Sequence, residues 1–153
     1  MEKFNCHIFE ISDSITEFVE NGATVPIYVS GSSMNPFLIS RRDIVWLSRF
    51  AYSDLKTGKI VLYRRIDGGM VLHRIVKILP EGRLVVRGDA QTWTEEIYKE
   101  QIVAVVSDIQ RKDRKRSANS CYWRIMDTIW RALIPFRSII MRAWFKIKRM
   151  KTN

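Results

Sequence analysis

Residues 59–88 have the sequence KIVLYRRIDGGMVLHRIVKILPEGRLVVRG, and this stretch decides the fold. Three runs rich in Val, Ile and Leu are separated by two turn signals, DGG at 67–69 and PEG at 80–82. Short β-branched runs bounded by Gly and Pro are typical of strands, and turns this short join antiparallel neighbours. The stretch therefore predicts three consecutive antiparallel strands.

The same texture continues on both sides of this stretch. Further apolar runs are VPIYVS at 25–30, DIVWLS at 43–48 and IVAVVSDI at 102–109. No helical pattern lies between these runs, so neighbouring strands have no helical crossover to join them in parallel. The six runs predict a mainly β domain built on an antiparallel, partly closed sheet or barrel.

The chain divides into four predicted segments. Residues 8–20 place apolar side chains at helical spacing before an Asn-Gly stop signal, which predicts a short opening helix. The stretch RKDRKRSANS has almost no apolar side chain and predicts a solvated linker. The predicted segments are an N-terminal helical segment at 1–23, the β domain at 24–110, a basic linker at 111–120 and a basic amphipathic helical tail at 121–153.

The tail carries apolar side chains at steps of three and four, which collects them on one face of a helix. Pro135 lies inside the pattern and predicts a kink or a split into two shorter helices. The apolar face comprises Ile125, Met126, Ile129, Leu133, Phe136, Ile140, Trp144 and Ile147, and the basic face comprises Arg124, Arg131, Arg142, Lys146 and Arg149.

The formal charge of +10 belongs to the C-terminal part of the chain. Residues 1–110 hold 13 Lys and Arg against 14 Asp and Glu, a net charge of −1, whereas residues 111–153 hold 13 against 2, a net charge of +11. A near-neutral domain with one basic appendage indicates that the tail meets an anionic membrane or an acidic partner. A domain that binds nucleic acid is less favoured. Docking of the tail on its own sheet or on a second copy remains an alternative.

The sequence also indicates where the protein works. The acidic N-terminus lacks the apolar core of a signal peptide, and no apolar run is long enough to cross a bilayer. Cys6 and Cys121 form neither a CxxC pair nor a disulfide framework, so reduced thiols are expected. These features predict a cytoplasmic protein, either free or peripheral on the inner face of the membrane.

Two residues could provide nucleophilic chemistry. Ser33 lies between Gly31 and Pro36, where a tight turn would expose its hydroxyl and nearby backbone N–H groups. His73 shares a strand face with Val71 and Ile75, so it is partly desolvated, and it is one of only two histidines. Each also has a structural interpretation, as a turn serine or as a satisfied core histidine.

A third candidate is the acidic stretch at 87–96, RGDAQTWTEE, expected as a loop between two strands. A carboxylate there could orient the imidazole and stabilise its charged form. The alternative is a turn aspartate that binds its own backbone, with Glu95 and Glu96 in solvent.

Residues 27–107 resemble the catalytic domain shared by signal peptidases and LexA-like self-cleaving proteins. In that family the nucleophilic serine directly precedes Met, with Pro two residues later, as in Ser33-Met34-Asn35-Pro36. Five short boxes carry the resemblance, in the family's order: VSGSSMNPFL (29–38), RRDIVWL (41–47), TGKIVLYR (57–64), LHRIVKI (72–78) and RGDA (87–90).

The resemblance implies a signal-peptidase/LexA-like fold and a serine endopeptidase without the usual N-terminal anchor. Most bacterial relatives have Lys as base, but the endoplasmic-reticulum type has His-Arg, as here, so a Ser33-His73 mechanism is implied. The implied orienting acid is Asp89, ranked slightly ahead, or Glu95, with Glu96 less favoured than Glu95. The turn residues Gly31, Ser32, Met34 and Pro36 are the implied substrate-binding residues.

The expected substrate is a signal or leader peptide with small residues before the cleaved bond, as in the family. No metal or cofactor is expected. Two alternatives remain: a catalytically silent relative that binds peptides or a partner protein, and a nucleic-acid-associated regulator that uses the tail. The sequence leaves the oligomeric state open.

Overall fold

The computed structural model describes residues 13–133 and 136–150. The chain forms two compact units, 1–119 and 120–153, and each is described by itself. In the first unit, residues 13–20 form a helix that ends in a turn at Asn21 and Gly22, as the stop signal predicts. The earlier part of the predicted opening helix lies outside the described residues.

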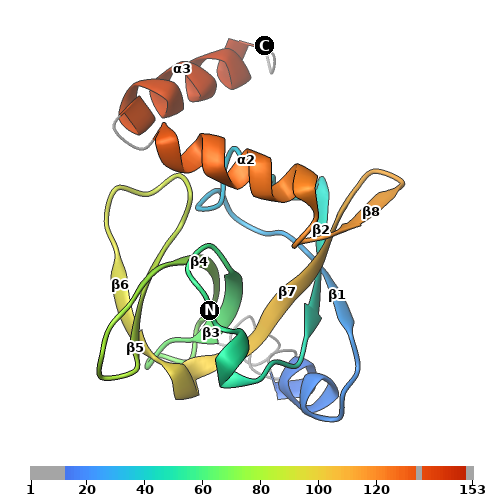
Figure 1. Ribbon diagram of the computed structural model, residues 1–153. Coiled ribbons are helices and arrows are strands. Elements are labelled where there is room, and N and C mark those ends of the chain that lie inside the picture. The colour runs from blue at the N-terminus through green and yellow to red at the C-terminus, as the bar shows by residue number, and fades with distance from the viewer. Residues whose placement is uncertain (1–12, 134–135, 151–153) are drawn as a thin grey trace. The chain divides into compact units, whose positions relative to one another are not determined.

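Eight strands form one antiparallel sheet in the order β1-β2-β7-β3-β4-β5-β6, with β8 paired to β7 (Figure 1). Two short 3-10 helices, η1 (Tyr52–Asp54) and η2 (Lys99–Gln101), lie in the connections. The strands are β1 (Val25–Tyr28), β2 (Asp43–Ser48), β3 (Ile60–Arg64), β4 (Met70–Ile78), β5 (Arg83–Arg87), β6 (Glu95–Tyr98), β7 (Ile102–Arg111) and β8 (Arg114–Ser117).

The antiparallel arrangement and all six predicted strands are confirmed, but two further strands were missed. The predicted loop at 87–96 is wrong in its second part, because Glu95 opens β6. The predicted linker at 111–120 is also wrong in part: Arg114–Ser117 form β8, which is fully exposed and pairs with β7. β8 contains no apolar side chain and is held by backbone hydrogen bonds to β7, so hydrophobic patterning could not predict it.

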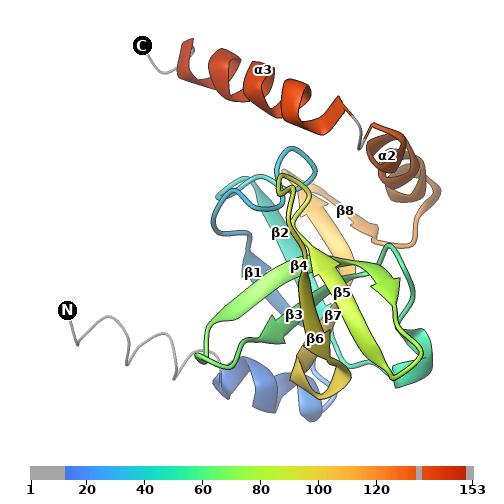
Figure 2. The ribbon, with the colours of Figure 1, turned by 90° about the vertical axis from the view of Figure 1, so that its left-hand side faces the viewer.

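The sheet is strongly curved but not closed, since β1 and β6, the ends of the strand order, do not pair within the described residues. Figure 2 shows the first unit from a second side, with β5 and β6 curling toward the viewer. One cluster of the core lies on the His73 face of the sheet and comprises Leu55, Val61, Tyr63, Ile75, Leu84, Val86, Ile97, Ile102 and Val105. Of the predicted partly closed sheet or barrel, the structure therefore has the sheet, which is curled and not closed.

The second unit contains two helices, α2 (Cys121–Ala132) and α3 (Arg137–Met150). The predicted split near Pro135 is confirmed, because one helix ends before this residue and the other begins after it. Within the described ranges, no helix is both long enough and apolar enough to cross a membrane. Cys121 is an exposed free thiol, whereas Cys6 lies outside the described residues.

Candidate active site

Ser33 lies in the turn that follows β1. Gly31 begins the turn with φ +76°, a left-handed conformation that glycine adopts without a Cβ clash. Ser33 is partly exposed, and within the described part of the chain its backbone N–H donates no hydrogen bond. Its carbonyl accepts a 2.8 Å hydrogen bond from the N–H of Ala90. Among the described residues, the turn thus combines a hydroxyl with a backbone N–H that makes no hydrogen bond, and such a pair of groups could bind an oxyanion.

The four predicted substrate-binding residues of this turn differ in accessibility. Gly31 and Ser32 are exposed and Pro36 is half-buried. Met34 is only 3% exposed, so it belongs to the interior and cannot present its side chain to a substrate on the surface. A substrate-binding role of Met34 would therefore depend on its backbone or on a pocket that reaches its side chain, and it stays a prediction.

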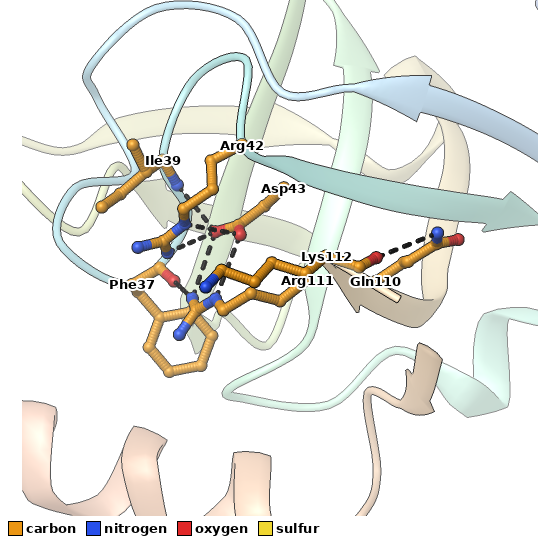
Figure 3. A network of polar contacts seen from close by, with 7 residues as sticks. All are labelled: Phe37, Ile39, Arg42, Asp43, Gln110, Arg111 and Lys112. Atoms are coloured by element: carbon orange, nitrogen blue, oxygen red, sulfur yellow. Dashed lines mark hydrogen bonds and ion pairs between the residues drawn. The ribbon is translucent and has the colours of Figure 1, made fainter. Parts of the chain in front are cut away.

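A buried carboxylate fixes the segment after the Ser33 turn (Figure 3). Asp43 accepts hydrogen bonds from the backbone N–H of Ile39 and from the guanidinium groups of Arg42 and Arg111. Arg111 also donates to the carbonyl of Phe37 at 2.8 Å. Burial alone would raise the pKa of Asp43, but these hydrogen bonds outweigh it and lower the pKa. The network ties the 37–39 segment to β2 and β7, which gives Asp43 a structural role.

His73 lies in the middle of β4, opposite Val61 of β3, and is 1% exposed. Tyr63 is two residues beyond Val61, so its side chain is on the same face of the sheet. Its hydroxyl is 3.1 Å from Nδ1 of His73 and donates a 3.0 Å hydrogen bond to Oε2 of Glu95. Arg65 pairs with both oxygens of the same carboxylate.

Curvature brings these side chains together. Glu95 is on β6, three strands away from Tyr63 on β3, a separation of about 14 Å in a flat sheet. Glu95 is paired with Val86, a core residue, so its side chain points to the concave side where Tyr63 and His73 lie. The curl of the sheet closes the remaining gap.

This chain of hydrogen bonds determines which imidazole nitrogen carries a proton. An ionised Glu95 can only accept, and the single O–H proton of Tyr63 is directed to it. The tyrosine oxygen can then interact with His73 only by accepting from Nδ1–H. Nε2 is left with its lone pair, which is the tautomer that a general base needs when the other nitrogen is held by an orienting group.

The pKa directions agree with this assignment. Burial lowers the pKa of His73, and the nearby Glu95 carboxylate offsets this effect only in part, so the imidazole is neutral near pH 7. Burial would raise the pKa of Glu95, but hydrogen bonds from Arg65 and Tyr63 lower it below its ordinary value. Burial and the Glu95 carboxylate raise the pKa of Tyr63, which keeps its O–H protonated.

Asp89 has a different partner from the one that sequence reasoning preferred. Both of its oxygens accept hydrogen bonds from Arg74, at 2.9 and 2.8 Å, and both side chains are nearly inaccessible to solvent. Arg74 also donates to the carbonyl of Gly58 and lies over the ring of Phe37, 4.4 Å from its centroid. Asp89 is thus bound to Arg74, whereas Glu95 is the acid that contacts Tyr63 beside His73, because successive residues of β4 point to opposite faces of the sheet.

The 88–94 segment links the serine turn to the histidine. At its beginning, Ala90 binds the carbonyl of Ser33, and a Cβ on Gly88 would lie only 2.6 Å from that same oxygen. At its end, the indole of Trp93 contacts the His73 ring edge-on, with centroids 6.4 Å apart. One short segment therefore contacts both residues of the predicted pair.

The described contacts do not include a hydrogen bond between Ser33 Oγ and His73. Glu96 does not join the site, since it pairs with Arg83 on an exposed part of β5 and β6. Among the described residues, no cluster of His, Cys, Asp and Glu could hold a metal ion.

Sequence reasoning missed Tyr63, Arg65 and Trp93. Tyr63 lies in an apolar strand and has the pattern of a core residue, so no local signal separates it from its neighbours. Alternation could have placed it on the face of Val61 and hence of His73, had the pairing of the two strands been used.

Comparisons of the chain with protein-family models, with curated proteins and with solved structures found no match.

Proposed function

We propose that the protein is a serine endopeptidase of the signal-peptidase/LexA-like type, with Ser33 as nucleophile and His73 as general base. The observation that carries the proposal is the chain from Arg65 through Glu95 and Tyr63 to His73, which leaves Nε2 as a proton acceptor. Among the described contacts, His73 forms its hydrogen bond through Nδ1, which is the arrangement of a general base held by an orienting group.

In the proposed reaction, the Ser33 hydroxyl proton moves to Nε2 of His73 while Oγ bonds to the peptide carbonyl carbon. The carbonyl electrons move to oxygen, and the Ser33 N–H donates to this oxyanion. The carbon–nitrogen bond then breaks, and the imidazolium gives its proton to the leaving amine. Water, deprotonated by His73, releases the acyl group and restores Ser33.

Glu95 acts through Tyr63 in this scheme, whereas Asp89 has a structural role. Positive charge on His73 during proton transfer is stabilised by the Glu95 carboxylate, which raises the pKa of His73 against the effect of burial. Catalysis also requires Ser33 Oγ to come within hydrogen-bond distance of Nε2. Catalytic hydrogen bonds are commonly long in free enzymes and shorten when substrate binds.

The proposed substrate is an extended peptide, such as a signal or leader peptide. β1 leads directly into the Ser33 turn and pairs only with β2 among the described strands. Its open edge can form backbone hydrogen bonds with an added strand, which would carry a peptide carbonyl toward Ser33. The preference for small residues before the cleaved bond rests on the family resemblance.

A fluorophosphonate probe, which labels activated serines, tests this function. We expect labelling of the wild type near pH 8 and its loss in both Ser33→Ala and His73→Gln. Ser53→Ala is the matched control, because Ser53 is an exposed serine of η1 outside the site. Melting curves of all four proteins show whether the variants remain folded.

Absence of labelling in a folded wild-type protein would overturn the proposal and favour a catalytically silent, peptide-binding relative. Labelling that persists in Ser33→Ala would overturn the choice of nucleophile.

A further inference from the structure

The helix α3, together with Phe136 directly before it, carries an apolar stripe that is exposed to solvent. Phe136, Ile139, Ile147 and Met150 have exposed fractions of 57, 66, 55 and 72%. They follow one another at helical spacing together with the exposed Ala143, so they line one face. Large aliphatic and aromatic side chains in such a row are costly in water unless something covers them.

The helix α2 has a similar exposed row. Tyr122, Ile125, Met126 and Ile129 have exposed fractions of 41, 53, 36 and 50%. Their spacing of three and four residues again places them on a single face. Both helices of the second unit therefore present apolar side chains to solvent.

The charge of this unit identifies what could cover the stripes. Residues 120–153 hold eight Lys and Arg and one Asp, a net charge of +7, and α3 contains five basic residues and no acidic one. Arg142, Lys146 and Arg149 are exposed and recur at steps of four and three, beside the apolar stripe of α3. An apolar stripe with a basic flank is complementary to the surface of an anionic bilayer, where charged headgroups lie over apolar acyl chains.

We propose that residues 121–150 bind the surface of an anionic lipid bilayer, with the apolar stripes at the acyl boundary and the basic side chains among the headgroups. Nucleic acid would pair with the basic side chains but leave the aliphatic stripe uncovered. The inference is independent of the peptidase proposal, because it uses no residue of the first unit.

Vesicle flotation of the full-length protein tests the inference. We expect binding to vesicles of phosphatidylcholine with phosphatidylglycerol and little binding to phosphatidylcholine alone. Replacing Arg142, Lys146 and Arg149 with Gln should lower the binding about 100-fold, since each basic residue near an anionic surface contributes about fivefold. The pair Ile139→Asn and Ile147→Asn should lower it by at least about tenfold, because the stripe would no longer enter the acyl boundary.

Ser138→Asn is the matched control, since this exposed residue of α3 lies outside the stripe, and binding should stay unchanged. Circular dichroism shows whether each variant keeps its helices. Equal binding to both kinds of vesicle, or to neither, would overturn the inference. The inference would also be overturned if the Gln variant lost binding while the Asn variant bound as well as the wild type. That pattern indicates a purely electrostatic partner such as nucleic acid.

Discussion

Replacing Tyr63 with Phe removes one oxygen atom from the centre of the candidate site. That atom is 3.1 Å from Nδ1 of His73 and 3.0 Å from Oε2 of Glu95. Phe keeps the ring in the core, whereas the hydrogen bonds to both neighbours disappear. Glu95 retains Arg65, so His73 loses most from the change.

The expected cost follows from the burial of His73. An imidazole N–H left without a partner in the interior lowers the free energy of unfolding by about 1–3 kcal/mol. The same change frees the imidazole to exchange its proton between the two nitrogens. We expect peptide cleavage to slow by about 10- to 100-fold, equivalent to about 1.4–2.8 kcal/mol in activation free energy.

The imidazole nitrogen signals in 15N NMR report the position of the proton directly. In a His7→Gln background, His73 is the only histidine. Near pH 8 we expect a protonated Nδ1 and a bare Nε2 in the parent, and a mixture of the two tautomers in Tyr63→Phe. In Glu95→Ala, the tyrosine O–H is free to donate to Nδ1, which should move the proton to Nε2.

A parent protein with its proton on Nε2 would refute the hydrogen-bond assignment whether or not the protein cleaves peptides. An unchanged tautomer in both variants would refute the role given to Tyr63 and Glu95.

Three further predictions concern stability. Arg74→Met should lower the free energy of unfolding in urea by about 3–5 kcal/mol, because it leaves the buried Asp89 carboxylate without its guanidinium; a loss below about 1 kcal/mol would contradict this. Gly88→Ala should lower it by about 1–3 kcal/mol, since its Cβ would approach the Ser33 carbonyl to 2.6 Å; an unchanged urea midpoint would show that the turn adapts. The lowered pKa of His73 means that the unfolded chain binds more protons, so stability is full above about pH 6.5 and falls below it by at most about 1.4 kcal/mol per pH unit. This acid sensitivity should be absent from His73→Gln between pH 6.5 and 5, above the range in which the carboxylates titrate.

Most of the strands that sequence patterning predicted have a buried face, whereas β1 was predicted from its apolar composition and contains no buried residue. β2, for example, alternates between buried and half-buried residues, as a strand with one face in the core does. β6 is four residues long with Ile97 as its one buried member, and β8 has none, so neither produces a hydrophobic period. Their existence depends on backbone pairing to β5 and β7, which local composition does not encode.

The candidate site divides in the same way. Ser33 and His73 could be proposed because each lies in a short local pattern. The choice between Asp89 and Glu95 could not be made, because their positions along the chain are nearly equivalent and only the sheet separates them. The contact between Tyr63 and Glu95 forms because the curved sheet brings β3 and β6 together, and sequence spacing does not indicate that curvature.

His73 and Arg74 are neighbours on β4 and point to opposite faces of the sheet, so the proposed reaction depends on the register of this strand. A slip of one residue would exchange the two side chains, placing a guanidinium before Tyr63 and an imidazole before Asp89. The pairing of β4 with β5 is irregular between Ile75 and Lys77. A slip of one residue would move this irregularity away from the position where β5 accommodates it, so the irregularity opposes the slip. A single-residue deletion in β4 should therefore abolish the proposed proton transfer even in a chain that still forms every strand.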